Sequence, residues 1–332
     1  MTVADIHTHG IGGYETRAAT PQDILRIAEI HGTQGIDAII PAIYPAPIKQ
    51  MRRDITAVQR AMEIQAARKN SSRLHVEDSK RIGQTSDIVN RKSWTGVENN
   101  DEYKTLDSEQ CAHENTPAAI LGVHLEGPFL NPARAGALDK TSFLSATMSN
   151  FEELIENFQT VVKIITIAPE LDGAPDLIRL ITDAGIIVSM GHSDATYGEA
   201  EAGFNAGAKG ITHLFNAMRG IHHREPGITG FGLINPHVYV EVIADPFHLH
   251  PKSIELIFRT KESNKIIIVS DSVKSTQANN GGHAVTDPAG MLVGGSMTVA
   301  GSAQYLIGLG FKKDLVGRCT GCNPTKYLSG QP

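Results

Sequence analysis

Six residues of types that bind divalent metals stand in or just after apolar runs of this chain. The first run leads into "DIHTHG", where two histidines are separated by one residue. The six candidate ligands are His7, His9, Glu126, His192, His213 and Asp271. Imidazole nitrogens together with carboxylate oxygens, and without thiolates, suit zinc, iron(II) or manganese, and these residue types do not choose among the three.

His7 and His9 are two residues apart, so in an extended strand both side chains point to the same side. A divalent cation held there would lower the pKa of a water molecule and polarise a carbonyl group. Any one of the histidines, taken alone, is more typical of an ordinary core or surface position. Glu126 or Asp271, taken alone, fits a helix cap equally well. The joint pattern favours a metal site over coincidence.

The candidate ligands need a scaffold that brings distant segments together. Eight runs rich in valine and isoleucine predict buried strands, at 3–10, 37–44, 119–127, 162–170, 185–193, 210–217, 238–245 and 265–272. Stretches of helical spacing separate most of them, so the sequence predicts an α/β fold, a (β/α)8 TIM-type barrel. We expect His213 within the sixth strand and the other ligands at strand ends, which meet at one mouth of such a barrel.

Composition narrows the class of partner. The 332 residues include 30 basic and 36 acidic side chains, with a net charge of -6, so no basic face predicts nucleic acid binding. We expect a small-molecule partner and no membrane association. The start of the chain lacks the pattern of a secretory signal, and three cysteines are too few for a disulfide framework, which together predict a cytoplasmic protein. The C-x-x-C of Cys319 and Cys322 has no second cysteine or histidine pair that would complete a zinc site.

One segment interrupts the alternation of strands and helices. Residues from about 69 to 116 are poor in apolar side chains and carry mixed charges. Such a segment buries too little apolar surface to offset its own ordering entropy. We interpret it as an insertion, partly disordered or a surface excursion, within a single barrel that spans residues 1–332.

The motifs "DIHTHG", "GVHLEGPFLNP", "GHSDAT", "THLFNAM", "REPG" and "VSDS" occur in this order. They resemble the amidohydrolase superfamily, and most closely the N-acetylglucosamine-6-phosphate deacetylases. The likeness extends from about Val3 to Ser272, apart from the polar insertion. It implies metal-dependent hydrolysis of the acetamide of N-acetylglucosamine 6-phosphate to glucosamine 6-phosphate and acetate, a step of amino sugar metabolism.

The resemblance also implies roles for individual residues. Glu126, His192 and His213 match the ligands of the principal metal, and His7 with His9 matches a pair that binds a second metal sharing the glutamate. The chain is therefore expected to hold one or two divalent ions. Asp271 is the expected catalytic carboxylate, which takes a proton from water and delivers it to the departing amine.

Further matches concern the substrate. Asn216 and Ala217 match a turn that contacts the sugar phosphate, and His248 matches a histidine that contacts the sugar. Arg224 matches a phosphate-binding arginine, a role that suits a planar guanidinium. Without the motif, Arg224 would be read as part of a surface ion pair.

Two departures from the family pattern stand out. Where members carry a histidine or glutamine that contacts the substrate, this chain has Leu138, which cannot donate that hydrogen bond. The β-sandwich that members build from their two ends is expected to be largely missing, which leaves the underside of the barrel exposed or covered by a partner subunit. A homodimer is expected.

Alternative functions remain open at this point. The same chemistry could act on another N-acyl amino sugar, such as N-acetylgalactosamine 6-phosphate, a possibility that Leu138 raises. A non-catalytic barrel kept for binding is the alternative from a different class. The retention of all six candidate ligands favours an enzyme.

Overall fold

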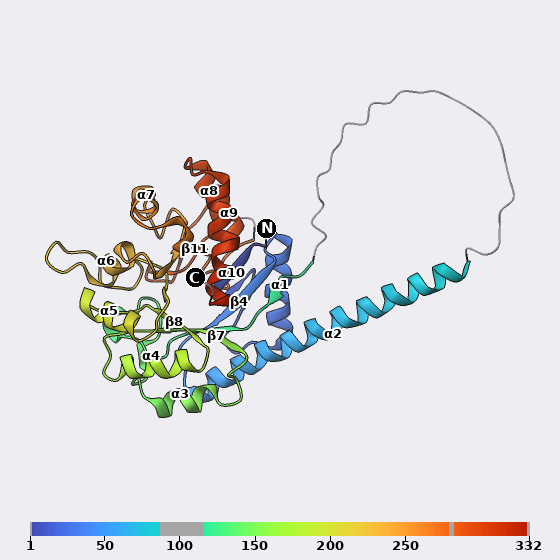
Figure 1. Ribbon diagram of the computed structural model, residues 1–332, viewed down its shortest axis with the longest axis horizontal. Helices are drawn as coiled ribbons and strands as arrows, with labels where there is room; N and C mark the ends of the chain where they lie inside the picture. The colour runs from blue at the N-terminus through green and yellow to red at the C-terminus, as the bar shows by residue number, and fades with distance from the viewer. Residues whose placement is uncertain (1, 87–115, 279–281, 331–332) are drawn as a thin grey trace, which may run out of the picture.

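The computed structural model describes residues 2–86, 116–278 and 282–330, and these form a (β/α)8 barrel (Figure 1). Its strands are β1 (Ala4–Thr8), β4 (Ala38–Ile43), β6 (Val123–Glu126), β7 (Val162–Ile167), β8 (Ile187–Met190), β9 (Gly210–Ile211), β10 (Tyr239–Ile243) and β11 (Ile266–Val269). They lie side by side in this order, and every neighbouring pair is parallel. The predicted fold class is confirmed, and each of the eight predicted runs contains one of these strands.

The first and last strands meet at the C-terminal end of the barrel. The His9 N–H donates to the Ser272 carbonyl at 2.7 Å, and the Asp271 N–H donates to the His7 carbonyl at 2.9 Å. A buried carboxylate reinforces this seam, because Asp5 accepts hydrogen bonds from the backbone N–H groups of His7 and Ser270. The seam therefore holds the segment of His7 and His9 beside the segment of Asp271.

Helices surround the sheet, and their sequences explain where they begin. Helix α1 (Pro21–Thr33) starts with a capping box between Thr20 and Asp23, with proline at its first position. Its buried residues, which include Ile24, Ile27 and Ala28, recur at helical spacing and face the sheet. The other helices beside the barrel are α3 (Met148–Ile155), α4 (Ala174–Asp183), α5 (Tyr197–Asn205), α6 (Gly227–Ile234), α7 (Pro251–Thr260), α8 (Val299–Gly308), α9 (Lys313–Gly317) and α10 (Asn323–Ser329).

The underside of the barrel is filled by the chain itself. Tyr327 of α10 is fully buried and packs in a cluster with the side chains that line the lower barrel, among them Ile6, Ile187 and Ile267. A Cβ atom at Gly210 would lie 2.2 Å from the Tyr327 hydroxyl, so only glycine fits there. The C-terminal helix therefore fills the floor of the barrel, and the expectation of an underside that is exposed or covered by a partner subunit stays a prediction.

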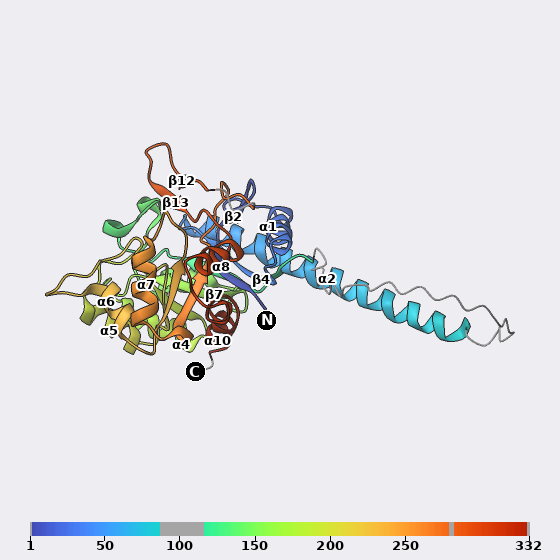
Figure 2. The same cartoon turned by 90° about the horizontal axis from the view of Figure 1, so that it is seen from above.

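Helix α2 (Ile48–Ser86) is the longest element and runs outward from the barrel, as both ribbon views show (Figures 1 and 2). The predicted polar insertion thus begins as a continuation of this helix, and its residues 87–115 lie outside the described residues. Among the described residues, no helix has the length together with the apolar character that crossing a membrane requires.

The predicted strands differ from the observed ones at two places. The third run is divided into β5 (Ala119–Ile120) and β6, with Gly122 between them at φ 152°. The sixth strand ends at Ile211, so the prediction that His213 lies within it is wrong. His213, Phe215 and Ala217 all have positive φ, a backbone conformation that is incompatible with a continuing strand.

Short hairpins complete the mouth. Strands β2 (Gly10–Ile11) and β3 (Tyr14–Glu15) pair directly after β1. Strands β12 (Val285–Thr286) and β13 (Leu292–Gly294) form a second hairpin, in the glycine-rich segment after Ser272. Residues at the end of this second hairpin reach the pocket described next.

Candidate active site

The candidate ligands line a pocket of about 250 Å³ at the C-terminal mouth of the barrel. Glu126, His192, His213 and Asp271 contribute to its wall. Loop residues 136–138 and 216–217 and the hairpin residues 291–294 form other parts. The pocket therefore combines a polar side with an apolar rim, an arrangement typical of small-molecule sites.

The first group of candidate ligands consists of Glu126, His192 and His213. Glu126 Oε1 lies 3.0 Å from His192 Nε2 and 3.1 Å from His213 Nε2. The two Nε2 atoms lie 3.1 Å from each other. All three side chains are buried, so these atoms face one another away from bulk water.

The second group consists of His7, His9 and Asp271. The Nε2 atoms of the two histidines lie 3.3 Å apart, and Asp271 Oδ1 lies 3.6 Å and 3.5 Å from them. Glu126 connects the two groups, because its Oε2 lies 3.2 Å from His9 Nε2 while its Oε1 contacts His192 of the first group. The barrel therefore brings all six predicted ligands into one cluster.

Backbone geometry places three of these side chains. His192, His213 and Asp271 have φ values of 47°, 32° and 48°, and each lies two residues beyond the end of its strand. Positive φ is uncommon outside glycine, although histidine and aspartate adopt it more readily than most residues. Such conformations cluster at functional sites, where the surrounding structure holds them.

Burial and neighbouring charges set the titration behaviour of the cluster in the absence of a cation. Burial opposes ionisation of Glu126, yet the imidazoles of His192 and His9 hold its pKa well below the usual range. Burial lowers the pKa of His7 well below its usual value. Burial, with the charge of Glu126, raises the pKa of Asp271 to about 8. A bound cation would favour the ionised carboxylates and the neutral imidazoles.

The hydrogen bonds behind the ligands test whether the cluster fits a metal. His192 Nδ1 donates to the Arg134 carbonyl at 3.0 Å, and His7 Nδ1 donates to the Glu241 carboxylate at 3.2 Å. In a neutral imidazole the remaining Nε2 then carries a lone pair, and each lone pair points at other acceptors. Buried acceptors this close are stabilised by a positive charge between them, and hydrogen bonds of this kind commonly orient metal-binding histidines. The residues therefore fit a divalent metal.

Of the predicted substrate-binding residues, Asn216, Ala217 and His248 line the pocket. His248 Nδ1 donates to Asp245 Oδ2 at 3.0 Å, which leaves Nε2 for another partner. Ser296, beyond the β12–β13 hairpin, also donates to Asp245 through its backbone N–H and its hydroxyl. Asp245 thus fixes the imidazole of His248 and ties it to the segment that follows the hairpin.

Two other predicted positions behave differently. Arg224 is exposed, and its guanidinium contacts His223 at 2.8 Å. It is not among the residues that line the pocket, so the structure does not bring it to the other site residues. Leu138 does line the pocket, as do Met291 and Leu292, and contributes to its apolar wall.

Sequence reasoning missed several residues that support the site. Glu241 lies behind His7, and His124 donates to or accepts from Thr166 at 2.8 Å inside the barrel. Burial raises the pKa of Glu241 to about 7 and lowers that of His124 to about 3. A signal existed, since each interrupts a run of apolar strand residues, and His124 is two residues before Glu126. Tyr44, whose ring stacks on His9, has no comparable signal.

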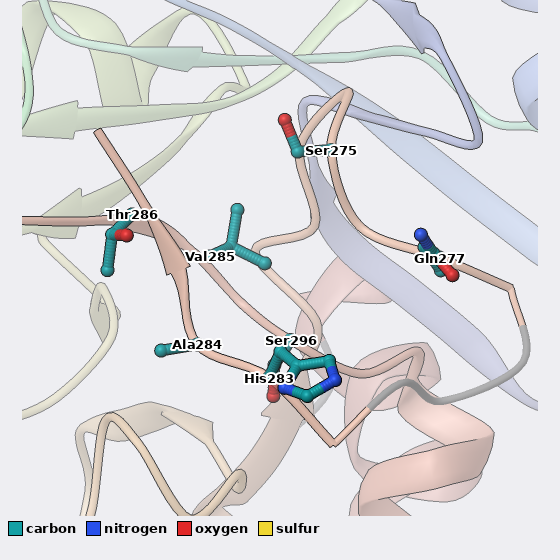
Figure 3. A pocket seen from close by; sticks show the side chains of 7 residues that line it. All are labelled: Ser275, Gln277, His283, Ala284, Val285, Thr286 and Ser296. Atoms are coloured by element: carbon teal, nitrogen blue, oxygen red, sulfur yellow. The ribbon is translucent and has the colours of Figure 1, made fainter. Parts of the chain in front are cut away.

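A second pocket lies beside the β12–β13 hairpin, outside the cluster of the six candidate ligands. It measures about 200 Å³, and Figure 3 shows Ser275, His283 and Ser296 among its lining side chains. None of the six candidate ligands lines it. Cys319 and Cys322 are free thiols. Among the described residues, neither belongs to a group of side chains that could hold a metal ion.

Comparison with known proteins agrees with the motifs. No model of a known protein family matches the chain. The chain is 29% identical over 308 residues to the N-acetylglucosamine-6-phosphate deacetylase of Vibrio furnissii and 38% identical over 194 residues to that of Bacillus subtilis. It is 30% identical over 214 residues to the N-acetylgalactosamine-6-phosphate deacetylase of Escherichia coli O157:H7.

These alignments cover 91%, 58% and 61% of this chain. They cover 65%, 46% and 56% of the relatives, so the chain spans less than two thirds of their length. A mutant N-acetyl-D-glucosamine-6-phosphate deacetylase from Mycobacterium smegmatis, solved in complex with N-acetyl-D-glucosamine-6-phosphate, has a similar fold. Its TM-score is 0.76 at 23% identity, covering 100% of this chain and 77% of that one. The resemblance to N-acetylglucosamine-6-phosphate deacetylases is thereby confirmed in sequence and in fold.

Proposed function

We propose that this chain is a metal-dependent hydrolase that converts N-acetylglucosamine 6-phosphate to glucosamine 6-phosphate and acetate. The observation that carries the proposal is the position of Glu126, whose two carboxylate oxygens face His192 with His213 on one side and His9 on the other. The named activity of the similar proteins supports the substrate class. Glu126, His192 and His213 would hold one divalent ion, and His7 and His9 would hold a second that shares Glu126.

The chain's own residues supply positioning and proton transfer. When bound, a divalent cation lowers the pKa of water and polarises the amide carbonyl. The Asp271 carboxylate takes a proton from the attacking water and later delivers it to the amine nitrogen, which leaves only when protonated. The backbone hydrogen bond from the Asp271 N–H to the His7 carbonyl holds this carboxylate beside His7 and His9.

Recognition of the sugar phosphate is assigned to the pocket wall and one residue outside it. Asn216 and Ala217 are proposed to contact the sugar phosphate. His248, whose ring is fixed by Asp245, is proposed to form a hydrogen bond with the sugar through Nε2. Arg224 is proposed to bind the phosphate, which requires its guanidinium to reach a ligand that extends beyond the lining residues. A planar guanidinium suits a dianionic phosphate.

A second substrate has a specific observation behind it. Leu138 lines the pocket at the position where the family resemblance implies a polar contact, and one similar protein is named for N-acetylgalactosamine 6-phosphate. Another N-acyl amino sugar phosphate is therefore the alternative substrate of the same site. The retention of all six candidate ligands argues against a non-catalytic binding protein. A cytoplasmic location and a homodimer, inferred from the sequence, complete the proposal.

The decisive assay measures release of free amine from a panel of N-acylated sugars, with and without a 6-phosphate group. The protein is first treated with a chelator and then given a defined amount of Zn²⁺, Fe²⁺ or Mn²⁺. We expect amine release only with metal, and faster release from the phosphorylated acetamides. The ratio between the glucosamine and galactosamine substrates decides between the two sugars.

A further inference from the structure

The ring of Tyr44 lies flat against the imidazole of His9. The two ring centroids are 3.8 Å apart, and the ring planes are inclined by 13°. Tyr44 follows the last residue of β4, so it stands at the same mouth of the barrel as the candidate ligands. The contact is therefore with a member of the second group, at the end of the neighbouring strand.

Arg17 completes the stack. Its guanidinium carbon lies 4.5 Å from the centroid of the Tyr44 ring. Because His9 occupies one face of the tyrosine at stacking distance, the guanidinium covers the opposite face. A cation above an aromatic ring is attracted by its negative face. Tyr44 is thus held from both sides, between an exposed arginine and a buried histidine.

His9 lacks the kind of support that its neighbour has. His7 and His192 each direct Nδ1 to an acceptor, the Glu241 carboxylate and the Arg134 carbonyl. Within the part of the chain that the structure describes, His9 Nδ1 is buried and has no hydrogen-bond partner. The contacts of the His9 ring with Glu126 and His7 are therefore made through Nε2 alone, and no hydrogen bond at Nδ1 fixes its rotation. The nearly parallel contact with Tyr44 restricts that rotation instead.

We infer that Tyr44, held by Arg17, is the positioning residue of His9 and sets the affinity of the second group for a divalent cation. This inference rests on the proposed metal-dependent function. The contact uses the ring, so phenylalanine should serve as well as tyrosine at this position. Loss of a group that orients a metal-binding histidine typically lowers metal affinity by about 10- to 100-fold.

The test counts bound ions in the intact protein. Chelator-treated wild type and variants are titrated with Zn²⁺ in a competing-chelator buffer, and zinc per chain is measured by mass spectrometry. We expect two ions in the wild type and in Tyr44→Phe. Tyr44→Leu should keep the ion of the first group and bind the second about 10- to 100-fold more weakly. Arg17→Ala should produce a smaller loss in the same direction.

Two further variants serve as controls. His9→Gln removes the ligand itself and should weaken the same ion. Phe258→Leu removes an aromatic ring that packs on Phe311, with centroids 4.5 Å apart, and should leave both ions in place. Circular dichroism and thermal unfolding establish that each variant is folded.

The possible results separate this inference from the proposed function. A second ion bound by Tyr44→Leu as tightly as by the wild type would overturn the inference, as would equal losses in Tyr44→Phe and Tyr44→Leu. A wild type that binds one ion would overturn it and leave the proposed hydrolase intact. A wild type that binds no zinc, and no iron or manganese in parallel titrations, would contradict the proposed function as well.

Discussion

The Nε2 atoms of His192 and His213 lie 3.1 Å apart, and both face Glu126 Oε1. His192 uses its Nδ1 proton for the Arg134 carbonyl, so its Nε2 presents a lone pair to the carboxylate. This lone pair and the buried carboxylate repel each other unless a proton or a metal cation lies between them. This repulsion destabilises the folded chain, and a bound metal ion would remove it.

The first prediction concerns Glu126. Glu126→Gln replaces the carboxylate that faces both groups by a neutral amide, so the purified variant should lose its divalent ions. Metal analysis of the protein as isolated should find at least one ion per wild-type chain and none in the variant. Glu255→Gln, at an exposed helical ion pair, is the matched control and should retain the metal. A wild-type protein that contains no metal and still hydrolyses the substrate would contradict this prediction.

The second prediction concerns Asp271. Asp271→Asn preserves the shape of the side chain and removes its basicity, so turnover should fall by about 10²-fold or more, the usual size of a general acid/base contribution. The ion of the first group and the binding of substrate should persist, because the proposed role lies in the transition state. Single-turnover kinetics with parallel metal analysis checks both parts. Wild-type rates in the asparagine variant would remove Asp271 from the mechanism.

The third prediction concerns Arg224. If its guanidinium binds the phosphate, Arg224→Ala should weaken the binding of the phosphorylated substrate by about 2 to 4 kcal/mol. This is the scale for truncating one partner of a desolvated charge pair. An unphosphorylated sugar should be nearly unaffected. Arg179→Ala, at an exposed helical ion pair, is the control. Equal losses with both sugars would assign Arg224 to structure, in keeping with its place outside the pocket lining.

The fourth prediction concerns stability at Lys261, whose buried ammonium group donates to the Asn235 carbonyl. Burial lowers the pKa of Lys261 to about 7. Between about pH 7 and the ordinary lysine pKa of about 10.4, the unfolded chain binds more protons than the folded chain, so the free energy of unfolding rises with pH. Lys261→Met removes this dependence.

The methionine variant should gain stability on the order of 1 to 3 kcal/mol at pH 7, after allowance for the lost hydrogen bond. The gain should shrink as the pH rises toward 10. Guanidinium denaturation at pH 7 and pH 9.5 measures it. Lys252→Met, at an exposed position on α7, should show no such trend. An equal difference at both pH values would contradict the assigned cause.

The alternation of apolar strands and helices was sufficient to predict the barrel. It was also sufficient to predict that His7, Glu126, His192 and Asp271 meet, because parallel strands bring their C-terminal ends to one mouth. The position of His213 was predicted less well, since its segment "GITHLFNA" has strand-like composition but turns after Ile211. The hydrophobic periodicity of a sequence does not indicate which histidine adopts a positive φ.

Contacts between side chains from different elements were not predictable in the same way. Tyr44 and His9 lie on neighbouring strands, and neither spacing nor residue type indicates that their rings stack. Tyr327 lies far along the chain from the strands whose lower residues it contacts. For the same reason, the sequence motif around Arg224 could not indicate that its guanidinium lies outside the pocket lining.

The most direct test of the central claim is acetate and amine release from N-acetylglucosamine 6-phosphate by the purified chain. The measurement is made after chelation and again after stoichiometric return of Zn²⁺, Fe²⁺ or Mn²⁺. We predict no release without metal, release restored by at least one of the ions, and a loss of about 10²-fold or more in Asp271→Asn under the same conditions. Release that is unaffected by complete metal removal, or no release from any N-acyl amino sugar with any of the ions, would contradict the proposed function.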